Sequence, residues 1–111
     1  MDALIAAPLH HSLLMENEFV RVLDTHVSAG DTVPLHSHEW PCVSYFLSFS
    51  DFIRRDADGA VLLDTAAAGL VLEPGTARWS GPLGLHTLEN VGSGKLHVVS
   101  VEIKQALSSV V

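Results

Sequence analysis

The histidines of this chain carry the clearest chemical signal in its sequence. His36 and His38 are separated by a single residue. Side chains alternate between the two faces of a β-strand, so both imidazoles would project from the same face. Neutral imidazoles that converge on one point begin a site for zinc, iron, nickel, copper or manganese. The pair alone is also typical of two exposed histidines on a polar strand, so a metal site needs a third ligand from elsewhere in the chain.

Most of the seven histidines call for no special explanation. His10 and His11 lie in a poorly patterned N-terminal segment, and we expect both to be solvated. His26 and His97 fall within apolar-rich runs, where an ordinary strand histidine is the simpler interpretation. The one remaining histidine outside the HxH pair is His86.

The elements that must position these residues are short apolar-rich runs separated by turn residues. The turns include Asp56-Ala57-Asp58-Gly59 and Pro74-Gly75, whose residue types favour tight turns. A helix is suggested only near the N-terminus, and no amphipathic helical segment separates the runs. We therefore predict an all-β sandwich or barrel rather than a parallel α/β fold. The runs, roughly nine in number, are 19–27, 32–38, 42–49, 51–55, 60–64, 69–75, 76–80, 86–94 and 95–103.

Length and composition limit the architecture and the partners. The 111 residues suffice for one domain with one core, and 48% of them are hydrophobic. This hydrophobic content is high for so small a chain and indicates that a second subunit covers part of its surface. We therefore expect a homodimer. The formal charge of −7, without clusters of lysine and arginine, argues against nucleic acid or an anionic membrane as partner.

Cysteine usage and the N-terminal sequence bear on the compartment. Cys42 is the only cysteine, so an intrachain disulfide is excluded. The N-terminus lacks the basic region of a signal peptide, and no apolar stretch approaches the ~20 residues of a membrane span. We expect a cytoplasmic protein with an N-terminal segment at 1–17, a barrel domain at 18–104 and a tail at 105–111.

A wider pattern surrounds the histidines. Gly30 opens a G-x5-H-x-H motif, Gly69 opens a G-x4-P-G motif, and His86 and Asn90 form H-x3-N. Together these resemble the two motifs of the cupin superfamily, over about residues 18–104, and the chain looks most similar to the small single-domain cupins. The resemblance implies a double-stranded β-helix, or jelly-roll, barrel.

The resemblance also implies one divalent transition metal ion (Fe, Mn, Ni, Cu or Zn) on His36, His38 and His86. Cupins usually add a glutamate ligand, but at that position this chain has Cys42; Glu39 directly follows His38 and would point the other way. Either water or substrate completes a three-histidine site, or the Cys42 thiolate is a fourth ligand. The cysteine-dioxygenase branch of the cupins shows a similar pattern. Three protein ligands with an open position are typical of a catalytic site.

Other residues are candidates for the cavity wall. Arg78, if it faces inward, could bind a substrate carboxylate through two hydrogen bonds, and Trp79 and Trp40 could line the pocket. Tyr45 and Arg78 are the candidate catalytic groups. Both tryptophans also fit a role in core or subunit packing.

These residues favour a metal-dependent enzyme that acts on a small organic acid, with an iron-type dioxygenase as the leading interpretation. A second reading is a non-catalytic cupin module that binds or senses a small ligand. A third is a barrel whose metal is purely structural or absent.

Overall fold

The computed structural model describes residues 1–104 of the chain. These residues contain nine β-strands and two one-turn helices. The predicted tail, 105–111, lies outside the described residues. Neither helix is long and apolar enough to cross a membrane. The elements are α1 (Ala3–Ala6), β1 (His11–Glu16), β2 (Val20–Val27), β3 (Thr32–His38), β4 (Cys42–Ser48), β5 (Phe52–Asp56), β6 (Val61–Asp64), α2 (Thr65–Ala68), β7 (Thr76–Ser80), β8 (Leu83–Asn90) and β9 (Leu96–Ile103).

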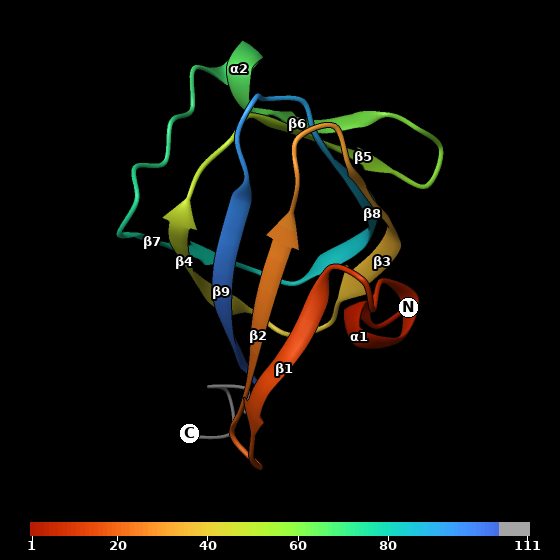
Figure 1. The fold of residues 1–111 in the computed structure, drawn as a ribbon. Helices are drawn as coiled ribbons and strands as arrows, with labels where there is room; N and C mark the ends of the chain where they lie inside the picture. The colour runs from red at the N-terminus through yellow and green to blue at the C-terminus, as the bar shows by residue number, and fades with distance from the viewer. Residues whose placement is uncertain (105–111) are drawn as a thin grey trace.

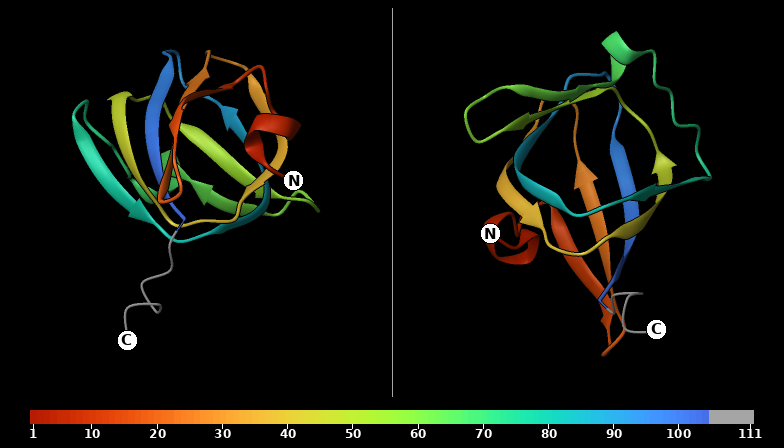
Figure 2. Two further views of the ribbon diagram at one scale, coloured as in Figure 1. Left: turned by 90° about the horizontal axis from the view of Figure 1, so that it is seen from below. Right: turned by 180° about the vertical axis from the view of Figure 1, so that it is seen from behind.

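The strands form two antiparallel sheets that face each other. One sheet has the order β1-β2-β9-β4-β7 and the other β3-β8-β5-β6. Figure 1 shows the two sheets curling into a barrel, and the view from below in Figure 2 shows them on opposite sides of its interior. Strands that are neighbours in a sheet are mostly distant in sequence, as in a jelly roll. The all-β jelly-roll prediction is confirmed.

The predicted turn between β5 and β6 is formed by the residues that favour it. One carboxylate oxygen of Asp56 accepts hydrogen bonds from the backbone N–H groups of Asp58 and Ala60, both at 2.9 Å. Gly59 adopts a φ of +87°, which only glycine tolerates readily. This local chemistry closes the hairpin and fixes the register of β5, a strand that contributes to the interior.

Two segments differ from the prediction. The run 69–75 is not a strand: Asp64 caps α2 by accepting from the backbone N–H of Ala67, and Gly69 ends the helix at a φ of +65°. The chain then passes to β7 without strand pairing, burying only Leu72 in the core. Conversely, His11–Glu16 pairs with β2 as strand β1, so the sheet begins ahead of the predicted boundary at residue 18.

Inward-facing residues divide the barrel interior into an apolar end and a polar end. Along β9, Leu96 and Val98 lie in the hydrophobic core, whereas Ser100 and Glu102 follow on the same face. The other strands that line the interior change in the same way, from Val27 to Arg21 on β2, Val33 to His36 on β3, Phe46 to Cys42 on β4, Phe52 to Arg54 on β5 and Leu88 to His86 on β8. The hydrophobic core thus fills one end and leaves the other for polar chemistry.

Candidate metal centre

The polar end of the barrel contains a cavity of about 120 Å³. Four histidines line it: His36 and His38 from β3, His86 from β8 and His11 from β1. His36 and His86 are direct partners in the β3–β8 ladder, which explains how distant parts of the sequence meet. Antiparallel partners place their side chains on the same face of a sheet, here the inner one.

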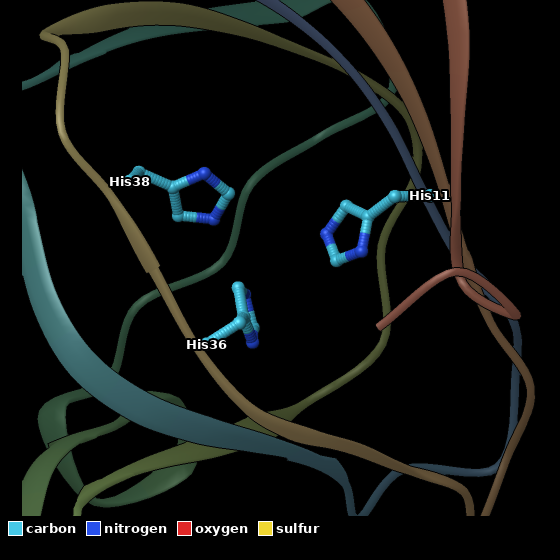
Figure 3. Close-up of side chains that lie close together, drawn as sticks. All are labelled: His11, His36 and His38. Atoms are coloured by element: carbon cyan, nitrogen blue, oxygen red, sulfur yellow. The ribbon is translucent and has the colours of Figure 1, made fainter. Parts of the chain in front are cut away.

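The four rings lie close together. The ligand nitrogens of His11, His36 and His38 all lie within 4.8 Å of one another, and Figure 3 shows these rings converging from two sides. Ring centroids are 4.9 Å apart for His36 and His38, and 5.0 Å apart for His11 and His36. His86 lies 4.3 Å from His36 and 5.5 Å from His38 by the same measure. The structure thus brings the three predicted histidines to one cavity together with His11, but the ligand atoms that meet within 4.8 Å are those of His36, His38 and His11, and the His86 ring lies beside this group.

The hydrogen bonds of His36 and His86 fix which ring nitrogen is free. Nδ1 of His36 lies 2.7 Å from the carbonyl oxygen of Pro34, and Nδ1 of His86 lies 2.6 Å from that of Gly84. A carbonyl oxygen only accepts, so each Nδ1 must carry the proton and donate it. In a neutral ring the Nε2 lone pair is then left free to bind a metal.

His11 and His38 are oriented in the same way. Nδ1 of His11 donates to the carbonyl oxygen of Ala7 at 3.0 Å, and Nδ1 of His38 donates to a carboxylate oxygen of Glu102 at 3.3 Å. Metal-binding histidines characteristically donate their second ring N–H to a carbonyl or a carboxylate. All four imidazoles are therefore held as Nδ1–H tautomers, the form in which Nε2 can bind a metal.

Burial keeps the rings of His36, His86 and His11 neutral. Desolvation lowers the pKa of His36 to about 3 and that of His86 to about 4, and the neighbouring titratable groups add smaller effects. Burial also lowers the pKa of His11. Neutral imidazole is the form that binds a metal, so no proton has to be displaced at neutral pH.

A buried carboxylate, that of Glu102, orients the His38 ring. Glu102 is 1% exposed and accepts from Nε of Arg21 at 2.6 Å with one oxygen while the other faces His38. Burial alone would raise the pKa of Glu102, but the hydrogen bonds from His38 and Arg21 outweigh it and the net pKa is lowered. Arg21 also bonds both carboxylate oxygens of Asp2, at 2.6 and 3.1 Å. The chain Asp2–Arg21–Glu102–His38 holds the imidazole in place.

The donor set fits a divalent transition metal ion. Four imidazole side chains line one cavity, and imidazole suits zinc, copper, iron and nickel, whereas magnesium and calcium prefer oxygen ligands. His36 and His86 are each 2% exposed, and among residues 1–104 each ring forms a hydrogen bond through Nδ1 but none through Nε2.

Cys42 lies in the cavity wall but apart from the group that meets within 4.8 Å. Its Sγ lies 3.6 Å from the hydroxyl oxygen of Ser44, and burial raises the pKa of the thiol. A raised pKa favours the thiol over the thiolate that binds metals. Glu102, the direct partner of Cys42 in the β4–β9 ladder, instead supplies a carboxylate beside the position where the family pattern has its glutamate.

Arg54 is the cation in the cavity wall. Its Nε is buried and has no hydrogen-bond partner among residues 1–104, and its guanidinium lies over the ring of Phe52 at 5.7 Å. Burial lowers the pKa of this guanidinium, an effect that Cys42 opposes and Arg78 reinforces. A cation desolvated without an anionic partner is costly, so this side chain is suited to receive an anion.

The predicted wall residues lie elsewhere. Trp79 is 59% exposed and Arg78 is also exposed, both on the edge strand β7. Tyr45, on β4, is 45% exposed. Trp40 is half-buried outside the cavity, beneath the side chains of Arg21 and Lys104. None of the four predicted residues is among those that line the cavity within residues 1–104.

Sequence reasoning missed three residues of this site. His11 was expected to be solvated but is 6% exposed, because β1 joins the sheet and turns its first side chain inward. Arg54 and Glu102 each continue the inward-facing face of an apolar strand, after Phe52 and Val98 respectively. A lone charged residue in phase with an apolar strand face was the available signal for both.

Solved structures share this fold. A cupin domain from Bordetella pertussis matches with a TM-score of 0.68 and 19% identity, over 86% of this chain and 92% of that one. A double-stranded β-helix protein from Klebsiella pneumoniae matches with a TM-score of 0.57 and 20% identity, over 84% and 74%. The polyketide cyclase RemF from Streptomyces resistomycificus matches with a TM-score of 0.55 and 18% identity, over 86% and 64%.

The sequence itself matches no protein-family model and no curated protein. The family likeness therefore rests on the fold, and each of the three structures shares it over more than four fifths of this chain. The chain thus has the double-stranded β-helix fold that these cupin structures share.

Proposed function

We propose that this cupin is a metal-dependent enzyme that acts on a small organic acid, with an iron-dependent dioxygenase as the favoured reaction type. The observation that carries the proposal is the pairing, within one cavity, of four histidines and a half-buried arginine, Arg54, whose buried Nε has no hydrogen-bond partner among the described residues. The first group suits a metal ion and the second suits an anion.

Charge favours an anionic substrate. Imidazole ligands are neutral, so they leave the charge of a divalent ion uncompensated. The nearest buried carboxylate, Glu102, is already paired with Arg21 and His38. Metal and Arg54 would together make the cavity cationic, although the chain as a whole has a formal charge of −7. A carboxylate could then bind between the two positive groups, with the guanidinium as its hydrogen-bond donor.

The shape of the cavity limits the rest of the substrate. At about 120 Å³ it admits only a small molecule or one end of a larger one. Its far wall belongs to the hydrophobic core, where Phe46, Phe52 and Val98 face the cavity. These side chains exclude water and favour an apolar portion on the bound acid.

The chain's own contribution is to bind, orient and desolvate. Arg54 would hold the acid by its carboxylate, and the Glu102–His38 contact would keep one metal ligand oriented. A bound iron ion would supply the chemistry of oxygen activation, whereas zinc, nickel or manganese would polarise an oxygen of the substrate. RemF, which shares the fold, is a polyketide cyclase. Because one fold supports unrelated reactions, the test must include reactions without an oxidant.

The test is an activity screen of the protein reconstituted separately with iron, manganese, nickel and zinc. Small carboxylic acids, with and without a thiol, are supplied, and oxygen consumption is measured beside mass-spectrometric detection of products. Oxygen uptake with an acid, only in the iron-loaded protein, supports the dioxygenase. An isomer or cyclised product without oxygen uptake retains the metal enzyme but replaces the reaction type. Acids that raise the melting temperature without any product would contradict catalysis and favour the ligand-binding module.

A further inference from the structure

A second cluster of metal-ligating side chains lies on the outer face of the five-stranded sheet. His26 on β2 and His97 on β9 are direct partners in the ladder, and Asp24 precedes His26 by two residues on the same face. The alternate residues of β2, Leu23 and Thr25, face the cavity instead. This cluster is therefore separated from the cavity histidines by the sheet itself.

The three side chains already converge. Nε2 of His26 lies 2.9 Å from one carboxylate oxygen of Asp24, and Nε2 of His97 lies 2.6 Å from the other. The two rings are stacked, with centroids 3.8 Å apart and planes inclined by 24°. All three ligand atoms lie within 4.8 Å of one another. Register and alternation thus place two imidazole nitrogens and a carboxylate around one point.

We propose that Asp24, His26 and His97 form a second, surface site for a divalent transition metal ion of the zinc, cobalt or nickel class. In the metal-free protein each Nε2–H donates to the carboxylate. On binding, each ring moves its proton to Nδ1 and offers its Nε2 lone pair, while the carboxylate exchanges two hydrogen bonds for the metal.

Ligand type and charge support this assignment. Two imidazoles and one carboxylate are a set that transition metals accept, and three protein ligands leave a position for water. With both rings neutral the cluster carries the single negative charge of Asp24, so a cation is attracted to it. Burial raises the pKa of Asp24, but the hydrogen bonds from His26 and His97 outweigh this and the net pKa is lowered. The carboxylate is therefore ionised at neutral pH.

Access to the site is open. The side chains of His26, His97 and Asp24 are 38%, 25% and 21% exposed, respectively. Each side chain is therefore accessible to a hydrated ion from solvent. The proposal does not depend on the function of the cavity, because no residue is shared between the two clusters.

The experiment is a titration of metal-free protein with Co²⁺, followed by calorimetry and by the visible absorption of the bound ion, and repeated with Zn²⁺. Three variants are compared with the wild type: His26→Asn/His97→Asn, which removes the surface ligands, His36→Ala/His86→Ala, which removes cavity ligands, and Ser12→Ala. Ser12 is exposed and lies opposite Asp24 in the β1–β2 ladder, so it is a matched control on the same face. Asp24→Asn is the second surface variant, should the double variant fail to fold.

We expect the wild type and Ser12→Ala to bind two equivalents, and each double variant to bind one. The equivalent lost with the surface histidines should have a different absorption spectrum from the one lost with the cavity histidines. A single equivalent that disappears only in the surface variants would support this site and contradict the cavity site. Binding that is unchanged in His26→Asn/His97→Asn and in Asp24→Asn would overturn the proposal.

Discussion

The imidazole rings of His11 and His36 lie 5.0 Å apart, although they come from opposite sheets of the barrel. His36 belongs to β3, and His11 is the first residue of β1, which pairs with β2 in the other sheet. A metal held by both rings would link the two sheets directly. Metal binding should therefore stabilise the fold as a whole and not only order the cavity.

Replacement of His11 by alanine tests whether it is a ligand. We expect the affinity for Zn²⁺ in the cavity to fall by at least ~10–100-fold, the range seen when even an outer partner of a metal ligand is lost. Competition with a chelator of known affinity measures the change, in the background of the surface variant His26→Asn/His97→Asn. Ser12→Ala is the control. An unchanged affinity would restrict the site to His36, His38 and His86.

The buried ion pair of Glu102 and Arg21 should be a main determinant of stability. Glu102→Ala would leave Arg21 with only the carboxylate of Asp2, and removal of one member of a buried pair costs about 3–5 kcal/mol. Urea denaturation of the metal-free protein measures the free energy of unfolding. Its control is Glu89→Ala, which breaks a half-exposed pair with Arg55 and should cost below about 1 kcal/mol. Equal losses in the two variants would contradict this account of Glu102.

Arg54 and its neighbour Arg55 provide a matched pair for substrate binding. Arg54 lines the cavity, whereas Arg55 pairs with Glu89 at 2.8 Å outside it. Arg54→Met should weaken binding of a small carboxylic acid about tenfold or more, since hydrogen bonds to charged groups contribute about 1.5–3 kcal/mol. Calorimetric titration of the metal-loaded protein measures the dissociation constant, and Arg55→Met should leave it unchanged.

The predicted role of Arg78 is tested in the same experiment. Arg78 is exposed and does not line the cavity, but it is close enough to influence the pKa of Arg54. A loss of affinity in Arg78→Gln together with normal affinity in Arg54→Met would reverse the assignment of the anion-binding residue.

The free energy of unfolding of the metal-free protein should decrease as the pH is lowered, and this decrease should begin at a higher pH than the one that the carboxylates cause. His36 and His86 have pKa values of about 3 and about 4 in the folded protein, against about 6.5 for an unperturbed histidine. Between these values the unfolded chain binds more protons, so stability is lost as the pH falls below about 6.5. Carboxylates with lowered pKa values, such as those of Asp2 and Glu102, contribute only at lower pH.

Chemical denaturation between pH 7 and pH 4.5, in the presence of a chelator, measures this dependence. The variant His36→Ala/His86→Ala should show a distinctly smaller loss over the same range. An equal loss in the variant would mean that other groups cause it.

The sequence predicted the parts of this molecule that local chemistry determines. Alternating strands, the Asp56–Gly59 turn and the shared face of His36 and His38 all follow from a few neighbouring residues. The convergence of His86 with His36 depends instead on the pairing of β3 with β8, and it was expected only through the resemblance to cupins.

The residues that sequence analysis misplaced depend on long-range pairing. His11 faces the cavity because β1 pairs with β2, and nothing within its own segment signals this. Arg78 and Trp79 were favoured by residue type, yet both are exposed on the edge strand β7, with Trp79 opposite Val43 on the outer face. The predicted homodimer remains a prediction, and such exposed apolar residues are where its interface would be sought.

Metal content is the most direct test of the central claim, that the cavity histidines hold a metal ion. The protein is purified without an affinity tag and analysed by elemental analysis, both as isolated and after reconstitution, beside His36→Ala/His86→Ala. The surface variant His26→Asn/His97→Asn serves as the parent, so that only the cavity is counted. We predict close to one equivalent of iron, manganese, nickel, copper or zinc, lost when His36 and His86 are replaced. No metal in the parent after reconstitution, or equal metal in both proteins, would contradict the claim.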